Sequence, residues 1–84
     1  MSQSIKLLFF SVLRDITGVN ETEWPLEAVP VSVTDLLEQL YERWPAMRDW
    51  DGTILVAADL NYIDRDGEIN AGQEVAIMPP VQGG

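Results

Sequence analysis

The sequence contains no histidine and no cysteine, and only one of its five basic residues is a lysine. Without histidine the chain lacks the commonest general base at neutral pH, and without cysteine it lacks the best soft nucleophile. The same absences exclude disulfides and the usual zinc ligands. Any chemistry must therefore come from carboxylates, hydroxyls, the lysine or the chain terminus itself.

Long apolar runs and basic clusters are also missing. No apolar stretch approaches the ~20 residues of a membrane-spanning helix, and the start of the chain does not have the pattern of a signal peptide. The net charge is −9, so a nucleic acid, which needs a basic face, is not an expected partner. We expect a cytoplasmic protein that does not contact membranes and whose partners are proteins with basic surfaces.

The chain is short but has the composition of a globular protein. Its 84 residues predict a single domain, 1–84, and 46% hydrophobic with 23% charged residues predicts a modest core. Strands are predicted where short apolar runs lie between turns. One or two helical turns are predicted within 11–18, where Val12, Leu13 and Ile16 have helical spacing and Gly18 is the stop. The predicted strands are 4–10, 21–26 (closed by Pro25), 53–58, 61–63 and 74–78.

The clearest predicted element is a helix between Ser32 and Pro45. Ser32 is the expected N-cap, Asp35 follows three residues later, and Pro45 ends the helix. One buried stripe is predicted from the helical spacing of Val33, Leu36, Leu37, Leu40, Tyr41 and Trp44. This order of elements predicts an α+β roll, a mixed sheet with the helix across one face and the first and last strands paired.

Three possible sites have simpler explanations. The segment 64–70, DRDGEIN, has its glycine at the fourth position and not the sixth of a calcium loop, so a hairpin turn is predicted. Asp49 and Asp51 beside Trp50 could form an acid–base pair, but we assign them to a solvated loop. Trp24, Trp44 and Trp50 are expected at the core or its edge. No metal or cofactor site is predicted, and no phosphate-binding loop precedes a helix.

The sheet face opposite the helix is predicted to be apolar. Period-2 alternation puts Leu8 and Phe10 on the face of Lys6, whereas Ile5, Leu7 and Phe9 face the other way. In the last strand the same count leaves Ala76 and Met78 outside. A contiguous exposed apolar patch of this kind is typical of a surface that binds a partner.

The chain leaves this patch as a stiff tail, 79–84. Pro79 and Pro80 cannot continue a sheet ladder and favour an extended chain. From Val81 to Gly84 the chain can reach roughly 13 to 14 Å. Gly83 and Gly84 have no side chains and can pass through a narrow channel. Such a tail is suited to deliver its carboxylate into the active site of another protein.

The segments LLFFSVLRDITG (7–18) and GQEVAIMPPVQGG (72–84) resemble the small subunit of molybdopterin synthase, a ubiquitin-like β-grasp family. The resemblance implies that the carboxylate of Gly84 is adenylated by an ATP-using activating enzyme, converted to a thiocarboxylate with sulfur from a donor protein, and inserted into the large subunit. There it would give sulfur to the molybdopterin dithiolene, within a heterotetramer. Gly83, Val81 and Pro80 would thread the channel. Phe10, Met78 and Leu8 would form the interface, with Met78 standing where the family often has an aromatic residue.

Other functions remain open at this point. The same terminus could serve another sulfur pathway, such as that of thiamin, or form an isopeptide bond as a ubiquitin-like modifier. The chain could also be an interaction module whose tail is idle. In every case the resemblance and the composition predict no catalysis by this chain alone, and no cofactor bound by it.

Overall fold

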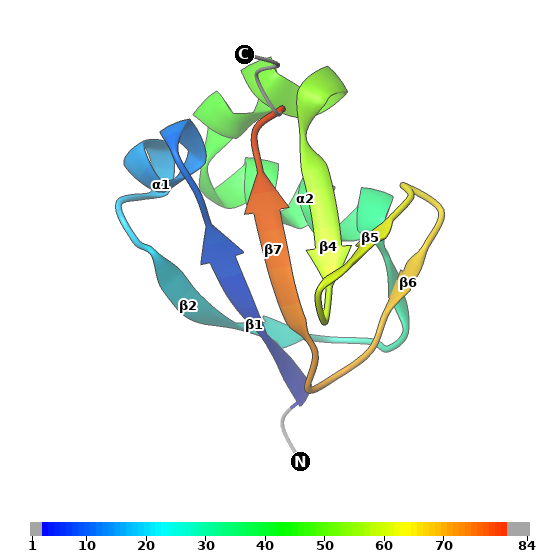
Figure 1. The fold of residues 1–84 in the computed structure, drawn as a ribbon. Coiled ribbons are helices and arrows are strands. Elements are labelled where there is room, and N and C mark those ends of the chain that lie inside the picture. Colours follow the sequence, from blue (N-terminus) through cyan, green and yellow to red (C-terminus); the bar gives the residue numbers. More distant parts are fainter. Residues whose placement is uncertain (1–2, 81–84) are drawn as a thin grey trace.

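The computed structural model describes residues 3–80. Five strands form one mixed sheet in the order β2-β1-β7-β4-β5, and two short strands, β3 and β6, form a second sheet. The elements in chain order are β1 (Gln3–Phe9), α1 (Val12–Thr17), β2 (Glu21–Leu26), β3 (Val31–Ser32), α2 (Val33–Arg43), the 3-10 helix η1 (Pro45–Thr53), β4 (Leu55–Ala58), β5 (Asn61–Ile63), β6 (Glu68–Ile69) and β7 (Glu74–Met78). Figure 1 shows α2 behind the large sheet, whose open face is turned toward the reader. The predicted α+β arrangement is confirmed.

The first and last strands lie side by side at the centre of the sheet, as predicted. They are parallel, with Leu7 opposite Val75 and Phe9 opposite Ile77. β2 is antiparallel to β1 on one side, and β4 is antiparallel to β7 on the other. Strands with neighbours on both sides and a helix over one face bury more side chains than edge strands do, which explains why β1 and β7 are so apolar.

The helix α2 covers the sheet with the stripe that its spacing predicts. Val33, Leu36, Leu37, Leu40 and Tyr41 are buried, whereas Trp44 is half-buried and follows the end of the helix at Arg43. The predicted cap is confirmed, because the backbone N–H of Asp35 donates to the Ser32 side chain at 3.0 Å.

The turn at 64–67 completes the cap of α2. The backbone N–H of Val33 donates to the Gly67 carbonyl at 2.9 Å, and that of Thr34 donates to the Arg65 carbonyl at 3.1 Å. These groups would otherwise lack partners at a helix N-terminus. The N–H of Gly67 donates to the Asp64 carbonyl at 2.9 Å, so a turn is present as predicted. It is not the predicted hairpin turn, because β5 pairs with β4 and β6 pairs with β3.

The core lies between α2 and the inner face of the sheet. Ile5, Leu7 and Phe9 are at most 2% exposed, and Phe9 meets the ring of Trp44 edge-on at a centroid distance of 5.3 Å. The three tryptophans are half-buried and pack against this core, as predicted.

Some boundaries differ from the prediction. The strand expected from residue 53 begins at Leu55, because η1 occupies 45–53. The small sheet of β3 and β6 was not predicted, since two residues are too few to show periodicity. The strand expected at 4–10 spans Gln3–Phe9, so Phe10 follows it. By contrast, β2 has the predicted bounds, Glu21–Leu26, and it can include Pro25 because a residue of an edge strand can lack a donor on its free side.

Candidate functional site

Six side chains, five from four strands and one from the residue after β1, form an apolar surface on the open face of the sheet, here called the open-face patch. Its members are Leu8, Phe10, Ala57, Tyr62, Ala76 and Met78. They border a shallow depression of about 250 Å³. Phe10 is 45% exposed and Tyr62 is 68% exposed, so large apolar groups of this patch meet solvent.

The strand register explains why the patch is hollow at its centre. Leu8, Ala76, Ala57 and Tyr62 lie opposite one another in a single row across β1, β7, β4 and β5. The two middle members are alanines, whereas larger side chains stand around them. A surface with small residues inside a larger apolar border suits an inserted side chain of a partner.

The structure places Leu8, Phe10 and Met78 together on this face, where alternation along the strands predicts them. Their role in binding a partner stays a prediction. The sequence did not identify Tyr62 and Ala57 as members. Tyr62 lies in a three-residue strand, and only its pairing with Ala57 shows which way it faces.

The tail departs from the edge of the open-face patch. β7 ends at Met78, and Pro79 and Pro80 follow outside the ladder. The N–H of Phe10 donates to the Ile77 carbonyl at 3.3 Å, which ties Phe10 to the end of β7. Of the predicted tail-threading residues, Pro80 is described and half-buried, whereas Val81, Gly83 and Gly84 lie outside the described residues.

A charged row borders the patch at the other end of the strands. Lys6 lies opposite Glu23 on β2 and Glu74 on β7, and its Nζ is 3.3 Å from a carboxylate oxygen of Glu21. One lysine among three acidic residues leaves this row negative. Because Glu74 begins β7 and Met78 ends it, about 13 Å of strand separates the row from the start of the tail.

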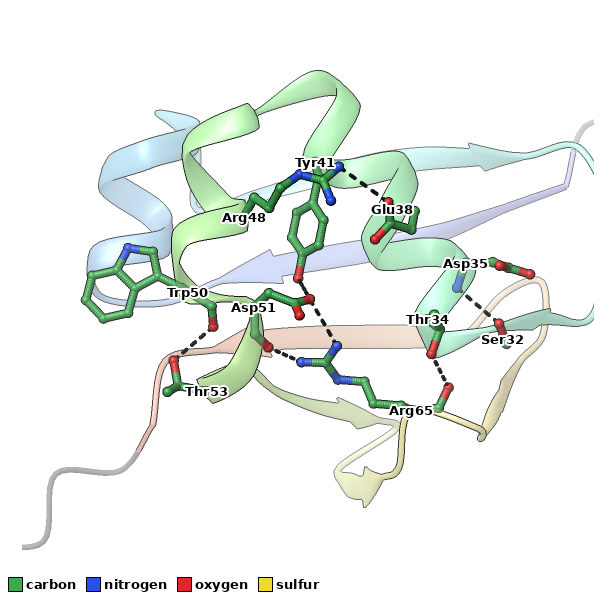
Figure 2. A network of polar contacts seen from close by, with 10 residues as sticks. All are labelled: Ser32, Thr34, Asp35, Glu38, Tyr41, Arg48, Trp50, Asp51, Thr53 and Arg65. Carbon is green, nitrogen blue, oxygen red and sulfur yellow. Dashed lines mark hydrogen bonds and ion pairs between the residues drawn. The ribbon is translucent and has the colours of Figure 1, made fainter.

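A polar network lies away from this patch, between α2, η1 and the segment after β5 (Figure 2). The Tyr41 hydroxyl donates to Asp51 at 2.5 Å, and the guanidinium of Arg65 donates to the same carboxylate at 3.1 Å and to the Asp51 carbonyl. Arg48 lies over the Tyr41 ring, 5.0 Å from its centroid, and pairs with Glu38 at 3.3 Å. The predicted solvated loop is therefore wrong for Asp51, which joins three segments.

The network also determines the protonation of its members. The hydrogen bond from Tyr41 and then that from Arg65 hold the pKa of Asp51 below its usual value. Burial, followed by the hydrogen bond and the charge of Asp51, raises the pKa of Tyr41 above its usual value. Asp51 is thus ionised and Tyr41 protonated near neutral pH, which suits a structural contact and not an acid–base pair.

Comparisons with known proteins show the family of the chain. The pattern of the ThiS family matches residues 7–84. The chain belongs to the ThiS family. It is 37% identical over 82 residues to the molybdopterin synthase sulfur carrier subunit of Chlamydomonas reinhardtii, covering 95% of this chain and 98% of that protein. The predicted resemblance to the small subunit of molybdopterin synthase is confirmed.

Two solved structures share the fold over most of their length. One is a candidate molybdopterin converting factor subunit 1 of Pyrococcus furiosus, with a TM-score of 0.81 and 28% identity, over 95% of this chain and 100% of that one. The other is SAMP1 of Haloferax volcanii, with a TM-score of 0.78 and 27% identity, over 96% and 99%. The predicted β-grasp fold is confirmed by these neighbours.

Two further features of residues 3–80 bear on function. No helix there is both long and apolar enough to cross a membrane. The same residues hold no group of three or more carboxylate, imidazole or thiol side chains placed to bind a metal ion.

Proposed function

We propose that this chain is the sulfur carrier subunit of a molybdopterin synthase and that the carboxylate of Gly84 carries the sulfur. The observation that carries the proposal is the open-face patch, which lies where β7 runs into the Pro79–Pro80 segment. A chain 37% identical to it, of nearly equal length, is a carrier subunit of that synthase. We further propose that the protein works in the cytoplasm.

The proposed chemistry begins with activation, because a carboxylate is a poor electrophile. An oxygen of the Gly84 carboxylate attacks the α-phosphorus of ATP, pyrophosphate leaves, and an acyl adenylate forms. Sulfur at the oxidation level of sulfide, from a donor protein, attacks the acyl carbon, and AMP leaves. The product is a thiocarboxylate, and no electrons are gained or lost overall. An adenylating enzyme binds the ATP, so this chain needs no cofactor of its own.

Delivery of the sulfur uses the shape of the molecule. The open-face patch docks on the large subunit, and Pro79 and Pro80 direct the tail toward its active site. Gly83 passes the narrowest part because it lacks a Cβ atom. The sulfur of the Gly84 thiocarboxylate then attacks a carbon of the pterin precursor and an oxygen substituent of that carbon leaves, after which water hydrolyses the acyl thioester and restores the carboxylate. Each carrier gives one sulfur, so two carriers supply the two sulfurs of the dithiolene. The carrier contributes position, and the large subunit in the assembled heterotetramer contributes the catalytic groups.

Three tail variants test this proposal. Deleting Gly84 shortens the reach by about 3.5 Å, and even 1 Å of misplacement at a reacting centre can cost on the order of a hundredfold in rate. Appending one residue places the carboxylate too far along, and Gly83→Val obstructs the channel. We expect each to abolish sulfur transfer in a reconstituted system, with circular dichroism like that of the parent. Transfer at the parent rate by the Gly84 deletion would show that the tail is idle.

A second candidate function is that of a protein modifier, which the fold similarity to SAMP1, a small archaeal modifier protein, supports. The intact mass of the protein from its native cell separates the two. A carrier has one oxygen replaced by one sulfur, whereas a modifier is found attached to lysines of other proteins. A thiamin-type carrier would also hold sulfur, but it would not transfer it to the pterin when mixed with the large subunit.

A further inference from the structure

The hairpin between β4 and β5 carries the most exposed large apolar side chain of the described residues. Ala58 and Asn61 pair at its base, so its tip consists of Asp59 and Leu60 alone. Leu60 is 93% exposed and stands next to the depression of the open-face patch, which it helps to line.

Both tip residues have left-handed backbone conformations. The φ angles are 49° at Asp59 and 73° at Leu60, as in a type I′ turn. Glycine and asparagine adopt this conformation readily, whereas leucine does so only with strain. A leucine at the second tip position therefore costs folding free energy through its backbone, and its exposed side chain returns almost none by burial.

Asp59, in contrast, has a structural reason for its position. Its carboxylate accepts hydrogen bonds from the Glu74 N–H at 3.0 Å and from the Gln73 side chain at 3.1 Å, and its own N–H donates to the Glu74 carbonyl at 2.8 Å. These bonds fix the tip against the start of β7. Leu60 is thus presented on a rigid support, so little ordering entropy would be lost when a partner buries it.

The surroundings of Leu60 define what it could bind. The depression that Leu60 helps to line is bordered by the apolar residues of the open-face patch and also by the carboxylate-bearing residue Glu74. Glu74 belongs to the negative row around Lys6. A complementary partner surface would combine an apolar pocket with a lysine or arginine beside it.

We propose that Leu60 is an anchor that inserts into an apolar pocket of the large subunit, next to a basic residue that faces Glu74. This inference rests on the proposed function. We take the large subunit as the partner that binds Leu60. When the tail of this chain enters the active site of the large subunit, the open face, from which the tail departs, is brought against the surface of the large subunit. Leu60 lies beyond the end of the patch that is farther from the tail, so it would control the angle at which the carrier docks.

Binding of Leu60 variants to the purified large subunit tests this anchor. Leu60→Asn and Leu60→Gly both suit the left-handed turn, so their melting temperatures should equal or exceed that of the parent. Because the side chain is expected to be fully buried in the complex, each should raise Kd by about tenfold or more. Leu60→Met keeps a long apolar group and should stay within about threefold of the parent.

Three results would overturn the anchor. If the parent binds and Leu60→Asn binds within twofold of it, Leu60 makes no contact of consequence, and the proposed function stands without it. If the parent itself does not bind the large subunit, the anchor and the proposed function both fail. Loss of binding by Leu60→Met to the same degree as Leu60→Asn would also count against an apolar pocket.

Discussion

The two faces of β1 show how one strand serves two purposes. Ile5, Leu7 and Phe9 are buried under α2, whereas Lys6, Leu8 and Phe10, the residue directly after β1, lie on the open face. Phe9 is 2% exposed and Phe10 is 45% exposed, although they are adjacent and chemically identical. Hydrophobicity alone therefore does not distinguish a residue of the core from one that stays exposed. The difference lies in whether another element of the same chain covers it.

The largest expected effect comes from truncating the two phenylalanines in turn. Phe9→Ala removes a buried ring and its contact with Trp44, so it should lower the free energy of unfolding by about 3–5 kcal/mol. Phe10→Ala should lower it by about 1 kcal/mol or less. Urea unfolding of both variants measures the difference. Equal losses would show that Phe10 belongs to the core and that the two faces do not differ as described.

The next largest expected effect is on binding to the large subunit and not on stability. Phe10→Asp puts a charge in the open-face patch, and it should weaken association with the large subunit by about 2 kcal/mol if Phe10 is a hot spot. Phe10→Leu, which keeps an apolar group, is the matched control and should bind nearly as the parent does. Calorimetric titration measures both. A Phe10→Asp chain that melts early but binds at parent strength would contradict this assignment of the face.

A smaller effect concerns the polar network behind the sheet. Asp51→Asn should lower the free energy of unfolding by about 1 kcal/mol near neutral pH, because it weakens charged hydrogen bonds at a half-exposed position. Binding to the large subunit should not change. Asp49→Asn, at an exposed carboxylate two residues away, is the control.

The pH dependence of this network has a definite sign. The folded pKa of Asp51 is lower than its unfolded value, so its contribution is present above the unfolded pKa and is lost as pH falls through the folded pKa. The parent should therefore lose stability on acidification more steeply than Asp51→Asn below about pH 4. Parallel curves for the two chains would mean that the carboxylate does not act as described.

The smallest expected effect is on the rate of association, and it comes from removing one charge of the negative row on the open face. Glu23→Gln and Glu42→Gln change the net charge equally, but Glu23 lies opposite Lys6 on the open face, whereas Glu42 is exposed on α2. Glu23→Gln should slow association with the large subunit by a few-fold at low salt and little at high salt, because ions screen steering between exposed charges. Stopped-flow rates measure this. The same slowing by Glu42→Gln would point to net charge and not to the face.

The helix and the central strands could be predicted because each carries a long local pattern. The stripe of α2, its Ser32 cap and the alternation in β1 and β7 all appear within single segments of the sequence. The predicted neighbourhood of Phe10 and Met78 follows from that alternation, once the two strands are paired. The roles of Gly83 and Gly84 stay predictions, since they lie outside the described residues.

The rest of the surface could not be predicted, because it depends on pairs of residues far apart in the chain. Tyr62 joins the open-face patch only through its register with Ala57, and Leu60 is exposed only because a two-residue turn forms at that place. Asp51 becomes a structural residue because η1 brings it to Tyr41 and Arg65.

The sequence by itself determined which residues favour a helix or a strand, which side of each element is apolar, and the family to which the chain belongs. The preference for helix or strand and the position of each apolar side depend on intervals of two to four residues, which are the same wherever the segment lies in space. Only the tertiary structure decided which apolar residues remain uncovered. That depends on where α2, the β4–β5 hairpin and the end of β7 lie relative to one another, and no local interval contains this information.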